Sequence, residues 1–190
     1  MPSLMIHLLV GEKFCDKNKI KNKEEFLKGN FAPDLVSNKE ESHFTKKSKK
    51  TTFTMALINK VDLRQLAKVD FDLSDDFQKG KFLHIVTDYY FYSYYLINEP
   101  NYQQYLDEPY DDVKDILYDE YCLAGNWIAN NFANLNYDLL PDAGKKIIIG
   151  EMKILSKQTL LNFVEFCSNL DMEEQYSVLK TTGKFKEVVK

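Results

Sequence analysis

Cysteine is scarce in this 190-residue sequence, which has three cysteines at widely separated positions and no Cys-x-x-Cys spacing. This usage argues against a disulfide framework and against a cysteine-based zinc site. Long apolar runs are also missing, because none approaches the roughly 20 residues that cross a bilayer. The N-terminal stretch MPSLMIHLLVGEKF has no basic residue ahead of its apolar segment. We therefore expect no transmembrane segment, no signal peptide and a cytoplasmic location.

The sequence also lacks an excess of positive charge. Its 25 Lys and Arg residues are outnumbered by 29 Asp and Glu residues, which gives a net charge of -4. This balance provides no general attraction to polyanions, so we do not expect a nucleic-acid polymer as a partner. Neither a glycine-rich phosphate loop nor a Gly-x-Ser-x-Gly nucleophile motif is present. Phosphate-loop enzymes and serine hydrolases are therefore not supported.

Helical periodicity is the main pattern that is present. With 44% hydrophobic residues, residues 1–190 are long enough for one domain with a substantial core and too short for two. We predict a single all-α domain, a bundle of about six to eight helices. Gly29 is expected to end the second helix and to begin an irregular loop at 29–50. The predicted helices cover residues 2–14, 23–28, 61–68, 75–98, 111–132, 157–169 and 172–179, with an extended segment at 51–57 and an ambiguous segment at 147–155.

The stretch KGKFLHIVTDYYFYSYYLI at 79–97 is the part around which the domain is expected to pack, because it is apolar or aromatic on nearly all sides. His84 and Asp88 are four residues apart, and this spacing puts two side chains on one face of a helix, one turn apart. An imidazole and a carboxylate so placed either hydrogen bond to each other or grip one cation. Gly80, one turn earlier, would leave room for a metal, a water or a substrate group.

The chain has only three histidines, and all of them fall in the half that also contains Asp34 and Asp88. A hydrolytic metal centre needs nitrogen and carboxylate ligands together with an open position for water. His7, Asp34, His43, His84 and Asp88 would supply such a set, and Asp88 could bridge two ions through its two oxygens. Each residue also has an ordinary explanation, as a hydrogen-bonded or solvated histidine or as a turn acid.

The order of these residues resembles that of the zinc-dependent phospholipase C family and its related nucleases, and in particular of short bacterial proteins of that kind. The similarity rests on the stretches MPSLMIH, FLKGNFAPD, SHF and FLHIVTDYYF and covers residues 1–95. It implies an all-helical, phospholipase C-like fold. It also implies that Asp34, His43, His84 and Asp88 bind one ion, with His7 and the second oxygen of Asp88 binding another.

The resemblance further implies a metal-dependent phosphoester hydrolase that holds one or two divalent ions, zinc above all. A metal-activated water would attack a small phosphoester or phospholipid-headgroup-like substrate, with Asp34 as the general base. Two other functions stay open. One is an HD-type nucleotide phosphohydrolase, although the sequence lacks the adjacent His-Asp pair of that class. The other is a non-catalytic helical protein that binds a metal or a partner.

Overall fold

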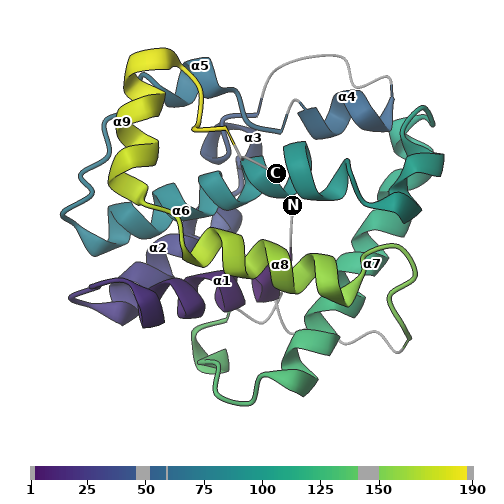
Figure 1. The fold of residues 1–190 in the computed structure, drawn as a ribbon, viewed down its shortest axis with the longest axis horizontal. Coiled ribbons are helices and arrows are strands. Elements are labelled where there is room, and N and C mark those ends of the chain that lie inside the picture. The colour runs from purple at the N-terminus through teal and green to yellow at the C-terminus, as the bar shows by residue number, and fades with distance from the viewer. Residues whose placement is uncertain (1–2, 46–51, 59, 141–149, 188–190) are drawn as a thin grey trace.

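All regular structure in the described part of the chain is helical (Figure 1). The computed structural model describes residues 3–45, 52–58, 60–140 and 150–187. These residues contain nine α-helices and no strand, so the prediction of an all-α fold is confirmed. The α-helices are α1 (Leu4–Lys17), α2 (Lys23–Leu35), α3 (Lys39–Ser42), α4 (Phe53–Ile58), α5 (Leu63–Leu66), α6 (Asp76–Tyr90), α7 (Tyr110–Asn131), α8 (Lys157–Ser168) and α9 (Met172–Thr182). Shorter elements are the π-helix η1 (Phe91–Leu96) and the 3-10 helices η2 (Pro100–Tyr105) and η3 (Tyr137–Leu139).

Helix α6 lies at the centre of the molecule, with α1 and α2 packed against it (Figure 1). The side chain of Asp75 caps its start by accepting a hydrogen bond from the backbone N–H of Gln78. Most of its side chains are buried, among them Phe82, whose ring packs against those of Phe71 and Phe185. The helix continues directly into η1 as a π-helix. The long helix predicted at 75–98 is thus present, with a change of type in its last part.

Two glycines bring α2 and α6 into backbone contact. A Cβ at Gly29 would lie 2.0 Å from the carbonyl oxygen of Phe77, and a Cβ at Gly80 would lie 2.0 Å from that of Phe26. Only residues without a side chain fit at this crossing. The prediction that Gly29 ends a helix is wrong, because α2 continues through it to Leu35. The expectation that Gly80 leaves room for a metal or a water is also wrong, because the backbone of α2 fills that space.

Three other segments differ from the prediction or extend it. The segment predicted as extended at 51–57 is helix α4 from Phe53 onward, and residue 51 lies outside the described residues. The predicted loop at 29–50 contains the last turns of α2 and the single turn α3, and residues 46–50 lie outside the described part. In the ambiguous segment 147–155, the described residues 150–155 form neither helix nor strand. The carboxylate of Glu120 on α7 holds this segment by accepting hydrogen bonds from the backbone N–H groups of residues 153–155.

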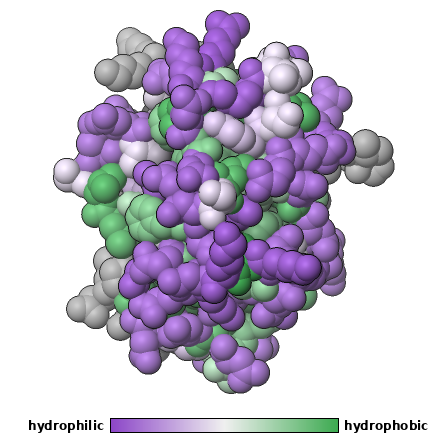
Figure 2. Space-filling view, turned by 90° about the vertical axis from the view of Figure 1, so that its left-hand side faces the viewer, coloured by the Kyte–Doolittle hydropathy of each residue, from purple (hydrophilic) through white to green (hydrophobic). Residues whose placement is uncertain are grey.

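Hydrophilic residues cover most of the face drawn in Figure 2, with smaller hydrophobic areas between them. The core beneath is rich in aromatic side chains, several of them fully buried, such as Phe26, Phe82, Phe91 and Phe163. None of the described helices combines the length and the apolar character that crossing a membrane would require.

Candidate metal centre

The structure brings together all five side chains singled out in the sequence. His7 lies on α1, Asp34 is near the end of α2, His43 directly follows α3, and His84 and Asp88 lie one turn apart on α6. Asp88 is in the middle of the group. Its Oδ1 lies 3.3 Å from Nε2 of His7, and its Oδ2 lies 3.7 Å from Nε2 of His43 and 3.8 Å from Nε2 of His84. Oδ1 of Asp34 lies 3.2 Å from Nε2 of His43.

All five side chains are buried. The exposed fraction is 0% for His7 and His84, 2% for Asp88, 3% for His43 and 5% for Asp34. Burying polar groups so deeply is unfavourable unless each finds a partner. The partners of the individual ring nitrogens and carboxylate oxygens therefore decide what the group can bind.

His84 presents an unprotonated nitrogen to the centre. Its Nδ1 lies 2.7 Å from the backbone carbonyl oxygen of Asn30. A carbonyl can only accept, so the ring hydrogen is on Nδ1. Burial and the neighbouring His7 lower the pKa of His84 to about 3, so the ring is neutral at pH 7. Its Nε2 therefore carries a free lone pair.

His43 is oriented in the same sense. Its Nδ1 lies 2.9 Å from Oγ of Ser42, and that hydroxyl donates its hydrogen to the backbone carbonyl of Pro33 at 2.8 Å. The hydroxyl oxygen therefore accepts a hydrogen bond from Nδ1–H of His43. In the neutral ring this leaves a lone pair on Nε2 as well.

The two Nε2 atoms of His43 and His84 are 3.0 Å apart. With both ring hydrogens on Nδ1, two lone pairs face each other, and both also face the carboxylates of Asp34 and Asp88. This arrangement is repulsive unless a cation lies among these atoms. A single proton could bridge the two nitrogens, but it would leave the atoms around His7 without partners.

Both carboxylates of the group are ionised at neutral pH. Burial alone would raise the pKa of Asp88, but the contact with His7 is the main influence that lowers it, and the pKa is held well below its usual value. Burial likewise opposes ionisation of Asp34, and the contact with His43 is the main influence that lowers its pKa. Two buried negative charges beside a neutral His84 favour the binding of a cation.

Several buried atoms of the group have no hydrogen-bond partner among the described residues. They are both ring nitrogens of His7, Oδ1 of Asp34 and Oδ1 of Asp88. Their contacts of 3.2 Å and 3.3 Å are short enough for ion pairing but are not aligned as hydrogen bonds. Leaving one such atom unpaired costs about 1–3 kcal/mol. An ion held by His7 and Asp34 would satisfy an atom of each, and an ion held by Asp88 would satisfy that carboxylate, so the donor set fits one or two metal ions.

Distance divides the five residues into two overlapping groups of three. His7, Asp34 and His84 form one, and His43, His84 and Asp88 form the other, with one ligand atom per residue within 4.8 Å of the other two. Imidazole nitrogen combined with carboxylate oxygen suits zinc and other first-row transition metals. His7 thus lies close to Asp34 and His84 as well as to Asp88, the partner that the resemblance gives it.

Sequence reasoning missed the residues that orient these ligands. Ser42 fixes His43 through its hydroxyl, and a serine directly before a ligand histidine is a local signal that could have been noticed. Asn30 fixes His84 through its backbone carbonyl, and its side-chain amide also donates to the carbonyl of His7 at 2.7 Å. Every residue has a backbone carbonyl, so no sequence signal reveals that role.

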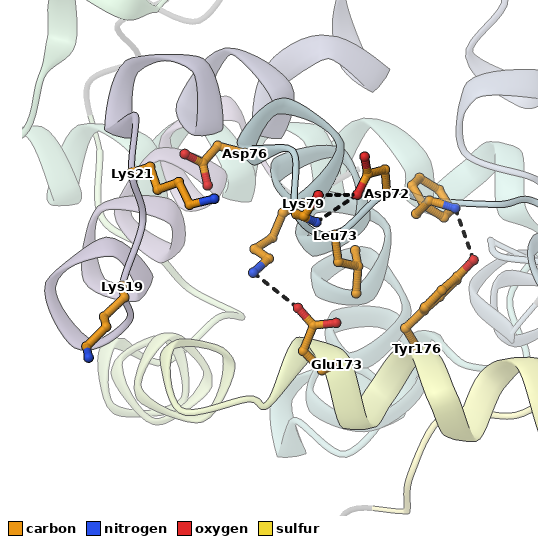
Figure 3. A pocket seen from close by; sticks show the side chains of 10 residues that line it. Lys19, Lys21, Asp72, Leu73, Asp76, Lys79, Glu173 and Tyr176 are labelled. Carbon is orange, nitrogen blue, oxygen red and sulfur yellow. Dashed lines mark hydrogen bonds and ion pairs between the residues drawn. The ribbon is translucent and has the colours of Figure 1, made fainter.

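The pocket drawn in Figure 3 lies apart from this group, at the start of α6. Lys19 and Lys21 line it from the turn between α1 and α2, and Lys79 contributes an ion pair with Glu173 of 3.2 Å. Lys79 precedes His84 by five residues, a rise of about 7.5 Å along the helix. Because the pocket contains charges of both signs and none of the five residues, we assign it no part in the site.

Comparisons with known proteins add no assignment. No family model, no curated protein and no solved structure matches this chain. A function must therefore be argued from the geometry of the buried group.

Proposed function

We propose that this protein is a metal-dependent phosphoester hydrolase with a phospholipase C-like helical fold. One or two divalent ions, zinc first among them, would be held by His7, Asp34, His43, His84 and Asp88. The facing Nε2 atoms of His43 and His84 carry the proposal. Both rings direct their Nδ1 hydrogens away from the centre, which leaves two lone pairs 3.0 Å apart beside two carboxylates. A divalent ion converts that repulsion into coordination.

The bound ion would supply Lewis-acid chemistry, polarising a phosphoryl oxygen and lowering the pKa of a coordinated water towards about 7. The residues of this chain would have separate roles. Asp34 is ionised and is the most exposed of the five, so it is the carboxylate best placed to accept a proton from an attacking water. His84 and Asp88 are fixed on the central helix, while Asn30 and Ser42 keep the imidazoles in the ligating orientation.

Burial and charge support the proposed substrate class. A deeply buried centre favours a small phosphoester or a phospholipid-headgroup-like compound over a bulky one, and the net charge of -4 disfavours a polyanion. Hydrolysis of any one compound of this class would agree with the proposal.

A second function is favoured by the burial itself. Structural metal sites are closed, whereas catalytic sites keep an open position. Because no side chain of the five is more than 5% exposed, the ion could instead hold α1, α2 and α6 together without turnover. The protein would then be a non-catalytic metal-binding protein.

The test combines metal analysis with a generic phosphodiesterase assay. Chelator-treated protein is reloaded with Zn²⁺, Mn²⁺ or Co²⁺, bound metal is counted by mass spectrometry, and hydrolysis of bis-p-nitrophenyl phosphate is followed. Asp88→Asn should lower metal affinity by at least about 100-fold, because it removes the negative charge and one oxygen of a ligand itself rather than a residue that orients one, and should abolish hydrolysis. Asp115→Asn on α7 is the matched control, because that carboxylate is exposed.

Each outcome decides between the candidates. Bound metal with hydrolysis that Asp88→Asn removes supports the hydrolase. Bound metal without hydrolysis of any phosphoester supports the non-catalytic function. Wild-type protein that retains no metal at micromolar concentrations contradicts both.

A further inference from the structure

The single turn α3 delivers His43 to the centre, and both of its ends are capped. At its start, the side chain of Asn38 accepts a hydrogen bond from the backbone N–H of Glu41 at 3.2 Å and donates one to Oε2 of Glu41 at 2.9 Å. The bond to the backbone N–H of Glu41 satisfies one of the free donors at the helix start, as an N-cap does. A turn of four residues would not persist in isolation, so its caps determine where the next residue, His43, emerges.

The other end of α3 closes around Phe44. The backbone N–H of Phe44 donates to the carbonyl of Glu41 at 3.1 Å, and that of Thr45 donates to the carbonyl of Glu40 at 2.8 Å. This pair of bonds is the Schellman motif, which requires a left-handed residue where Phe44 stands. Glycine is the usual residue there. His43, the candidate ligand, directly precedes this left-handed position.

Phe44 adopts the left-handed conformation with φ at +52°, the only non-glycine residue among those described that has a positive φ. This region is unfavourable for any residue that has a side chain. Glycine would avoid the cost, so the aromatic ring must contribute something that offsets it.

Phe44 is partly buried against the core, and it lines one groove with the neighbours of two candidate ligands. It lines an apolar groove together with Pro33, which precedes Asp34, and Ile85, which follows His84. The carbonyl of Phe44 also accepts a hydrogen bond of 2.6 Å from the backbone N–H of Asp62. Phe44 is thus fixed by backbone bonds on two sides and by packing against the hydrophobic core.

We propose that Phe44 is a positioning residue for the metal centre. Its left-handed backbone reverses the chain directly after His43, and its side chain, packed on the core beside the groove that Pro33 and Ile85 line, fixes the direction from which the imidazole of His43 approaches His84 and Asp34. The inference rests on the proposed function, because the consequence of this positioning is the affinity for a divalent ion.

Two substitutions separate the ring from the backbone. Phe44→Gly keeps the left-handed turn without strain and removes the ring, whereas Phe44→Ala removes the ring and keeps the strain. Phe132→Ala is the matched control, since Phe132 is also partly buried but packs against Trp127 at the end of α7. Zinc affinity is measured by competition with a chelating dye, and the ligand field by the visible spectrum of the Co²⁺ form.

Both Phe44 variants should lose about 10–100-fold in zinc affinity, the usual effect of removing a residue that orients a ligand, and Phe132→Ala should lose none. Wild-type affinity and an unchanged Co²⁺ spectrum in Phe44→Gly would overturn the inference. Thermal unfolding with chelator present shows that each variant is folded.

A metal-free readout keeps this result separate from that of the proposed function. In protein without metal, the ¹H–¹⁵N correlation of the His43 ring, assigned by its loss in His43→Gln, reports the bond from Nδ1–H to Ser42. If wild type binds no metal, the proposed function fails. The positioning role is then decided by whether this signal shifts in Phe44→Gly and not in Phe132→Ala, and an unchanged signal contradicts it.

Discussion

Replacing Gly80 by alanine tests whether the contact between α2 and α6 sets the geometry of the buried centre. The new Cβ would lie 2.0 Å from the carbonyl oxygen of Phe26 and 2.9 Å from the backbone nitrogen of Asn30. Both obstacles are backbone atoms of α2, so no side-chain rotation relieves the clash. The two helices must separate by about 1 Å or more to restore an ordinary contact.

The expected cost follows from two opposing effects. Alanine in a helix interior is favoured over glycine by about 1 kcal/mol. Overpacking against rigid atoms costs about 1–3 kcal/mol and sometimes more, and here the backbone of α2 cannot give way. With an overpacking cost at the upper end of that range, about 3 kcal/mol or more, less the gain of about 1 kcal/mol, we expect Gly80→Ala to lower the free energy of unfolding by about 2 kcal/mol or more. At about 2–4 °C per kcal/mol for a chain of this size, the melting temperature should fall by several degrees at least.

Gly125→Ala on α7 is the control for helix propensity. Its Cβ would lie 3.2 Å from Cγ and 3.4 Å from Cβ of Met5, contacts that a shift of a few tenths of an ångström relieves. We expect this variant to be as stable as wild type or about 1 kcal/mol more stable. Urea unfolding followed by circular dichroism, with chelator present, compares the two. If Gly80→Ala is as stable as Gly125→Ala, the close crossing of α2 and α6 is not a feature of the folded protein.

Three further results are expected. If Gly80→Ala folds, it should also bind zinc more weakly. Metal–ligand distances can vary by only about 0.2 Å, and the substitution shifts Asp34 relative to His84. An unchanged zinc affinity would contradict this coupling. Ser42→Ala removes the acceptor of the His43 ring hydrogen, so zinc affinity measured by dye competition should fall about 10–100-fold, and a Ser42→Thr variant, which keeps a hydroxyl, should retain most of it. His84 has a folded-state pKa of about 3, below its unfolded value of 6.5, so its contribution to stability is complete above pH 6.5 and is lost as the pH falls, because the unfolded state then binds the proton. Without metal, the free energy of unfolding of wild type should fall by up to about 1.4 kcal/mol per pH unit between pH 6 and 4, and that of His84→Asn should fall less. Urea unfolding at several pH values measures both, and an equal dependence on pH in the two proteins would refute the pKa given to His84.

The sequence predicts this fold best where periodicity is long. The apolar pattern of residues 75–98 corresponds to α6 and η1, and that of residues 111–132 corresponds to α7. Residues 29–35 show why local sequence signals do not always predict where a helix ends. Gly29 and Pro33 are ordinary helix-ending signals, yet both lie inside α2. The reason is tertiary, since Gly29 is needed where the helix meets the carbonyl of Phe77.

In the candidate site, too, the sequence predicts some neighbours, while others depend on how the helices pack. The spacing of His84 and Asp88 on one helix predicts that they are neighbours, and the structure places them so. The approach of His7, Asp34 and His43 could be expected only from the order of motifs, because no local pattern links α1, α2 and α3. The hydrogen bonds from Ser42 and to the carbonyl of Asn30 depend on how these elements pack, which residue types alone do not specify.

The distribution of the five side chains over α1, α2, the end of α3 and α6 has a thermodynamic consequence. An ion bound at their meeting point would act as a cross-link between segments that separate on unfolding, so its binding energy would add to the resistance of the chain to denaturation. At a free concentration 1,000 times its dissociation constant, such a ligand contributes about 4 kcal/mol. The melting temperature of this protein would then report the metal content of its surroundings.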